Sequence, residues 1–172
     1  MNPHHALQQV SPWVEAHAGL VAPGGTVLDL AAGGGRHSRY FAWHGRKVVA
    51  VDKDVSALSH LPGVTAIQAD LEDGSPWPLQ GQVFDAAVVT NYLHRPLFPD
   101  LFAAIRTGGI LIYETFARGN EAYGKPDNPD FLLDPNELVA RTLNQFVIVA
   151  FEDRYVDAPK PAIVQRIAAM KI

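Results

Sequence analysis

The sequence predicts a doubly wound α/β fold, with a mostly parallel seven-stranded sheet that ends in an antiparallel hairpin. Along residues 26–114, short apolar runs bounded by turn residues alternate with segments of helical spacing, as in repeated βα units with buried strands. Residues 146–155 and 162–172 are β-rich runs joined by Ala158-Pro159-Lys160-Pro161, which favours a terminal antiparallel pair. We expect one domain over residues 1–172.

The first half of the chain carries clear boundary signals. Ser11 followed by Pro12 is typical of a helix N-cap with proline at the first helical position, and Gly19 ends this helix. We expect Trp13, in the same helix, to pack in the core. The further elements expected are strands at 26–30, 47–52, 65–69 and 86–90, and helices at 38–44 and 55–60.

The second half begins with a helical face over residues 98–105, after which a glycine pair turns the chain into a fifth strand at 110–114. Residues 117–135 are rich in Gly, Asn, Asp and Pro, and the segment is too long for a simple connection. We interpret it as a lid over the functional site. A helix over 138–143 then precedes the terminal strands.

Composition narrows the class of protein. The formal net charge is -4, so no overall basic field favours a nucleic-acid partner. The absence of cysteine excludes disulfides, thiolate metal sites and a cysteine nucleophile. No apolar run is long enough to span a membrane, and the first residues lack the pattern of a signal peptide, so we expect a cytoplasmic protein without a membrane partner.

A glycine-rich turn stands directly between the first expected strand and the next helix. It reads Asp29-Leu30-Ala31-Ala32-Gly33-Gly34-Gly35-Arg36-His37. Missing side chains in such a turn allow a ligand to approach the backbone. A dinucleotide site requires G-x-G-x-x-G, but Ser38 occupies the third glycine position, which disfavours NAD.

The turn resembles motif I of class I methyltransferases, an acidic residue followed after one residue by G-x-G-x-G. Ala31 replaces the first glycine, which is acceptable if its φ is negative. Within that class, the form D-L-x-x-G-x-G-R-x-S is similar to the tellurite-resistance-like branch. It is matched by Asp29, Leu30, Gly33, Gly35, Arg36 and Ser38.

This resemblance implies a Rossmann-like methyltransferase fold and S-adenosylmethionine as the cofactor. In the family, an acidic residue at the end of the second strand binds the ribose hydroxyls, and Asp52 occupies that position, followed by Lys53. Asp70 and Leu71, after the third strand, correspond to residues that recognise adenine. The expected cofactor-binding residues are Asp29, Ala31, Gly33, Gly35, Arg36, Asp52, Lys53, Asp70, Leu71 and Asn91.

The expected catalytic residues are Asn91, Tyr92 and His94, which follow the fourth strand where the family presents its acceptor. Asn91 would orient the cofactor or acceptor, Tyr92 would shape the acceptor cavity, and His94 would remove a proton near neutral pH. Alternatively, Asn91 and His94 cap the following helix and Tyr92 packs in the core.

Other polar residues leave alternatives open. Arg36 and His37 either hold the carboxylate of the cofactor or an anionic acceptor, or are solvated. Glu114 ends the fifth strand beside the expected lid. We expect no metal site, because His4 and His5 lie in the terminus without acidic partners at ligand spacing.

A small-molecule acceptor is the first choice, although its identity and the oligomeric state are not specified by the sequence. The alternatives are a non-catalytic protein that binds S-adenosylmethionine as a sensor or partner-binding module, and a dinucleotide-dependent oxidoreductase.

Overall fold

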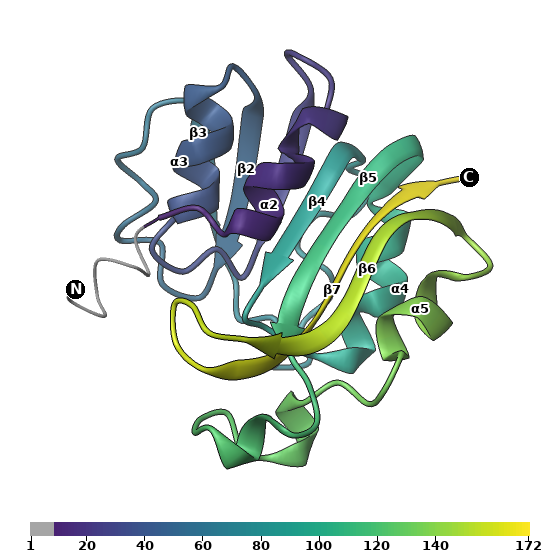
Figure 1. The fold of residues 1–172 in the computed structure, drawn as a ribbon. Coiled ribbons are helices and arrows are strands. Elements are labelled where there is room, and N and C mark those ends of the chain that lie inside the picture. The colour runs from purple at the N-terminus through teal and green to yellow at the C-terminus, as the bar shows by residue number, and fades with distance from the viewer. Residues whose placement is uncertain (1–8) are drawn as a thin grey trace.

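The computed structural model describes residues 9–172, which form a seven-stranded sheet with strand order β3-β2-β1-β4-β5-β7-β6 (Figure 1). Neighbouring strands from β3 to β5 are parallel, and β7 is antiparallel to both β5 and β6. The predicted parallel sheet with a terminal antiparallel hairpin is therefore confirmed. The strands are β1 (Thr26–Leu30), β2 (Lys47–Asp52), β3 (Val64–Gln68), β4 (Phe84–Thr90), β5 (Ile105–Phe116), β6 (Phe146–Val156) and β7 (Ala162–Lys171).

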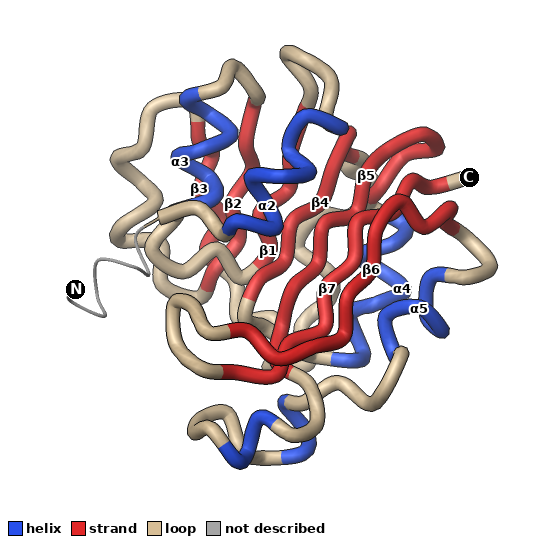
Figure 2. Tube along the Cα trace, in the orientation of Figure 1, coloured by secondary structure: helices blue, strands red, loops and turns tan. Residues whose placement is uncertain are grey.

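Helices cover both faces of the sheet, as predicted (Figure 2). One apolar cluster joins alternate strand residues to the first two helices, and a second joins the other strand residues to the last two. Because side chains alternate along a strand, β1 supplies Val27 to the first cluster and Leu28 to the second. The helices are α2 (Pro12–His17), α3 (Arg36–Trp43), α4 (Phe98–Ala103) and α5 (Glu137–Thr142), with short 3-10 turns η1 (Ala18–Leu20), η2 (Arg95–Leu97), η3 (Asn120–Ala122) and η4 (Pro129–Phe131).

The start of α2 follows the predicted capping pattern. The backbone N–H of Trp13 donates to Oγ of Ser11 over 3.2 Å, and Pro12 occupies the first helical position. Trp13 is buried, and its indole N–H donates to the carbonyl of Ile167, which confirms the expected core role.

Two sequence predictions of secondary structure were wrong. Residues 55–60 form turns rather than a helix, although Leu58 is fully buried there. The glycine pair before the fifth strand does not separate a helix from a strand, since β5 already begins at Ile105. The pairing of β5 with β4 skips from Ile105 to Ile110, so the two glycines lie in an irregularity within β5, where Gly108 has a φ of 78°.

Residues 1–8 carry the histidines considered for a metal site, His4 and His5, and both lie outside the described residues. Among residues 9–172, no helix combines the length and apolar character needed to cross a bilayer.

Candidate functional site

The glycine-rich turn lies at the carboxyl edge of the sheet, between β1 and α3. Gly33 and Gly35 have φ values of 54° and 76°, the left-handed region that glycine enters without strain. A side chain on Gly35 would collide with Leu58 and Leu61, at 2.7 and 2.8 Å, whereas a Cβ on Gly33 would meet no atom within 4 Å. The turn therefore packs tightly on one side and leaves backbone open on the other.

Ala31 departs from the sequence expectation. We expected a negative φ at this position, but the structure gives 55°. The first position of the turn therefore requires the left-handed conformation, which explains why glycine is usual there. An alanine holds this conformation only with strain.

Asp29 lies beneath the turn rather than on its open side. Its side chain is buried, and Oδ2 accepts a hydrogen bond of 2.6 Å from Oγ of Ser38 in α3. Burial raises the pKa of Asp29 to about 6, against the opposing effect of the Ser38 hydrogen bond. Asp29 thus fixes the start of α3 relative to β1, so its effect on a ligand above the turn is indirect.

Asp52, at the end of β2, contacts the turn directly. Its Oδ2 accepts the backbone N–H of Gly33 over 2.7 Å, and its Oδ1 accepts the N–H of Asp54 over 3.0 Å. A carboxylate has about four acceptor positions, so further hydrogen bonds remain available to a ligand. The structure therefore brings Asp52 and Gly33 together.

The expected adenine end lies one strand further out, beyond β3. Lys53 and Asp70 face each other with Nζ and Oδ2 3.9 Å apart, and both side chains are exposed. Oδ1 of Asp70 accepts the N–H of Glu72, while Leu71 is half-buried beside it. Because β3, β2 and β1 are neighbours in the sheet, these residues share its carboxyl edge with Asp52.

The residues after β4 occupy the other side of this edge. Asn91 is exposed with a φ of 54°, and its backbone N–H donates to the carbonyl of Glu114. The hydroxyl of Tyr92 is buried and has no hydrogen-bond partner among the described residues. Burial and the nearby Glu72 carboxylate raise the pKa of Tyr92. His94 is half-buried at the N-cap of η2, but its side chain makes no capping hydrogen bond, contrary to the capping alternative.

His37 was treated as a possible anion ligand, but it is buried and has two neutral partners. Its Nε2 accepts the backbone N–H of Ser11 over 3.1 Å, so its Nδ1 carries the proton and faces Oγ1 of Thr90 at 3.3 Å. Burial and the charge of Arg36 lower the pKa of His37 to about 3. A neutral imidazole therefore joins the segment before α2 to α3 and the end of β4.

Sequence reasoning did not identify Ser11 as part of this edge. Its hydroxyl donates to Oε1 of Glu114 over 2.6 Å, and Oε2 of Glu114 accepts from Arg166 over 3.0 Å. Arg36 donates to the carbonyl of Gln9 over 3.2 Å. Residues 9–11 therefore lie against the first turn of α3, directly after the glycine-rich turn.

The segment 117–135 lies at the carboxyl edge beyond β5 (Figure 1), and it is firmly attached there. Arg95 donates to the carbonyls of Asp130 and Leu132 and, through two nitrogens, to Glu137 at 2.8 Å each. Burial alone would raise the pKa of Glu137, but hydrogen bonds led by Arg95 lower it to about 2. Asn120, within this segment, is buried; its side chain donates to the carbonyl of Pro126 and accepts the backbone N–H of Ile163.

Across residues 9–172, no three His, Asp or Glu side chains gather in a group that could hold a metal ion. The candidate site consists of four features at the carboxyl edge of the sheet: the glycine-rich turn, Asp52, the pair Lys53 and Asp70, and residues 91–94.

Comparisons with known proteins agree with this architecture. Residues 28–111, from β1 into β5, match a family model described as a methyltransferase domain. TehB from Haemophilus influenzae has a TM-score of 0.77 and 17% identity, over 95% of this chain and 63% of that chain. A TehB-like S-adenosylmethionine-dependent methyltransferase from Corynebacterium glutamicum has a TM-score of 0.68 and 14% identity, over 99% of this chain and 100% of that chain.

A third structure, the glycopeptide N-methyltransferase MtfA complexed with S-adenosyl-L-homocysteine, has a TM-score of 0.63 and 18% identity, over 92% of this chain and 88% of that chain. No curated protein matches the sequence. Residues 28–111 are therefore similar to a methyltransferase domain, and the strand order is that of the class I methyltransferase fold. TehB and the TehB-like methyltransferase share this fold with the chain.

Proposed function

We propose that this protein, as a single cytoplasmic domain, transfers a methyl group from S-adenosylmethionine to a small-molecule acceptor. The observation that carries the proposal is the contact between Asp52 and Gly33, which joins the end of β2 to the open backbone of the turn after β1. This arrangement suits a ligand that has hydroxyls for a carboxylate and an uncharged body for the glycine backbone. A nucleoside cofactor has both.

The residues present fit such a cofactor. Open space above Gly33 gives the cofactor access to the backbone, and Asp52 retains acceptor positions for a ribose diol. Asp70 and Leu71 would hold the adenine, with Lys53 beside them. Asn91 and Arg36 would bind the amino-acid end, while Asp29 and Ala31 set the shape of the turn.

The cofactor supplies an activated methyl group, so the protein mainly orients the acceptor and excludes water. Asn91 and Tyr92 flank the acceptor position in this proposal. His94 is the candidate base for an acceptor that must lose a proton, because its half-buried side chain makes no capping hydrogen bond to η2. The lack of an overall basic charge favours a small acceptor over nucleic acid.

Binding calorimetry with S-adenosylmethionine tests the cofactor assignment. We expect the wild type to bind it and not NAD, and Asp52→Ala to weaken binding roughly ten- to a hundred-fold, the range for lost hydrogen bonds to a charged group. Asp52→Asn distinguishes charge from shape. Asp54→Ala is the matched control, because the exposed Asp54 carboxylate accepts the N–H of Ser56, and alanine keeps the backbone N–H that donates to Asp52.

Folded wild-type protein that does not bind S-adenosylmethionine would refute the proposal. Equal loss of affinity in Asp52→Ala and Asp54→Ala would refute the assigned role of Asp52. If binding is found, a screen of small nucleophiles with the labelled cofactor then identifies the acceptor.

A further inference from the structure

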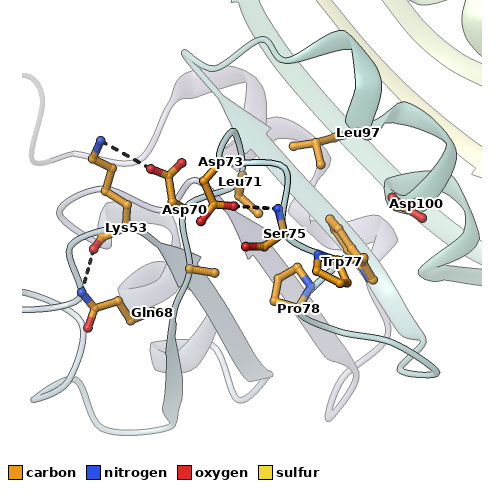
Figure 3. A pocket seen from close by; sticks show the side chains of 12 residues that line it. Lys53, Gln68, Asp70, Leu71, Asp73, Ser75, Trp77, Pro78, Leu97 and Asp100 are labelled. Atoms are coloured by element: carbon orange, nitrogen blue, oxygen red, sulfur yellow. Dashed lines mark hydrogen bonds and ion pairs between the residues drawn. The ribbon is translucent and has the colours of Figure 1, made fainter.

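A cleft of about 560 Å³ opens between the connection after β3 and the start of α4 (Figure 3). That connection, residues 69–83, contains turns but no helix, so a loop covers this part of the sheet. Lys53, Asp70 and Leu71 line one end, next to the proposed cofactor site, and Asp100 of α4 lines the other. Its volume is within the range of sites that hold a small molecule.

The wall of the cleft is apolar and partly aromatic. Trp77 stands between Pro76 and Pro78, and Leu97 of η2 lies across from this group (Figure 3). Trp77 is half-buried and packs against the core, so the indole has a fixed support. Such a wall binds flat apolar groups, and an indole face also attracts cations.

The charged groups that line the cleft are mostly negative. Asp70, Asp73 and Asp100 contribute three carboxylates, whereas Lys53 is the one cationic residue in the lining. Nζ of Lys53 lies 3.9 Å from Oδ2 of Asp70, and both side chains are exposed, so the pair is weak. The part of the cleft beside Trp77 therefore combines an aromatic wall with uncompensated negative charge.

We propose that the part of this cleft beyond Lys53, Asp70 and Leu71 binds a small organic ammonium ion that carries a flat apolar group, next to the proposed cofactor site. The apolar group lies against Trp77 and the flanking prolines, and the ammonium group lies toward Asp100, at the end of the cleft away from Asp70 and Asp73 (Figure 3). Carboxylates and an indole both favour a cation, so the site discriminates against neutral and anionic compounds of the same shape.

Calorimetric titration of the full chain with benzyltrimethylammonium tests this proposal. Benzyl alcohol and phenylacetate serve as neutral and anionic probes of similar shape, and each titration is repeated with excess S-adenosylmethionine. We expect the cation to bind most tightly, and S-adenosylmethionine to leave its affinity unchanged. Trp77→Ala and Asp100→Asn should each weaken cation binding roughly three- to ten-fold.

Asp100→Asn keeps the test decisive if Trp77→Ala disturbs the core, because Asp100 is exposed. Glu15→Gln is the matched control, since it removes an exposed carboxylate on α2, on the other face of the sheet. The proposal is overturned if the cation does not bind, if the neutral probe binds as tightly, or if Asp100→Asn has no effect. Displacement of the cation by S-adenosylmethionine also overturns it, because the cleft would then belong to the cofactor site.

Discussion

Buried neutral His37 makes the stability of the protein sensitive to acid. In the folded state the pKa of His37 is lowered from 6.5 to about 3 by burial and by the charge of Arg36. In the unfolded chain the same imidazole titrates near its ordinary value. The unfolded state therefore binds more protons below pH 6.5, and stability is lost as the pH falls from 6.5 toward 3.

The size of this effect follows from the two pKa values. At pH 5 the solution is about 1.5 units below the unfolded pKa and still above the folded one, so about 2 kcal/mol of stability is lost at roughly 1.4 kcal/mol per unit. Asp29 acts in the opposite direction, because burial raises its pKa to about 6 and acid relieves the penalty of its buried charge. The pH profile of the wild type alone therefore mixes the two groups.

The variant His37→Gln isolates the imidazole. Urea unfolding at pH 7.5 and pH 5 gives the free energies of unfolding of wild type and variant, and we expect the difference between them to shrink by about 2 kcal/mol at the lower pH. His44→Gln, at the exposed end of the same helix, is the matched control. A difference that stays constant with pH would show that folded His37 is protonated as easily as the unfolded residue, which refutes this account.

Two further variants test strain and anchoring. Ala31→Gly should raise the free energy of unfolding by up to about 1 kcal/mol, because glycine adopts a φ of 55° without strain. Ala32→Gly is the control: Ala32 has no positive φ, so the substitution should lower the free energy of unfolding by a similar amount. Urea unfolding measures both. Arg95→Leu should lower the free energy of unfolding by about 1–3 kcal/mol and speed hydrogen exchange in residues 126–135, because two carbonyls lose a donor and Glu137 loses one of its two arginine partners. Arg118→Leu, which breaks an exposed pair, is the control, and equal effects of the two arginine variants would contradict the anchoring role.

The parallel core was predictable because its strands contain short apolar runs with glycine or turn signals at their boundaries. The capping of α2 by Ser11 was equally local, since serine followed by proline satisfies the first helical positions without help from elsewhere. The helix expected at 55–60 is absent, although the apolar residue that suggested it, Leu58, is buried as expected. An apolar Leu58 must be buried, but a turn that packs against Gly35 buries it as well as a helix would.

Some features of the candidate site could likewise be predicted from the sequence, whereas others depend on contacts that form only in the fold. Asp52, Asp70 and Asn91 could be placed at the carboxyl edge because each follows a predictable strand, and the sheet order then brings them together. The sign of φ at Ala31 could not be predicted, because it depends on how the turn closes between β1 and α3. The environment of Asp29 likewise depends on Ser38, which reaches the carboxylate only once α3 packs against the sheet.

The contacts that were missed join residues far apart in sequence, and their chemistry gives the segment before α2 a defined role. Ser11 bonds Glu114, which is 103 positions away, while its backbone N–H requires an unprotonated Nε2 on His37. Protonating His37 would place two N–H donors against each other at that contact. Acid would then weaken the attachment of residues 9–11 to the first turn of α3, the element that the glycine-rich turn leads into. As acid lowers the stability through protonation of His37, residues 9–11 should therefore become exposed before the sheet itself opens.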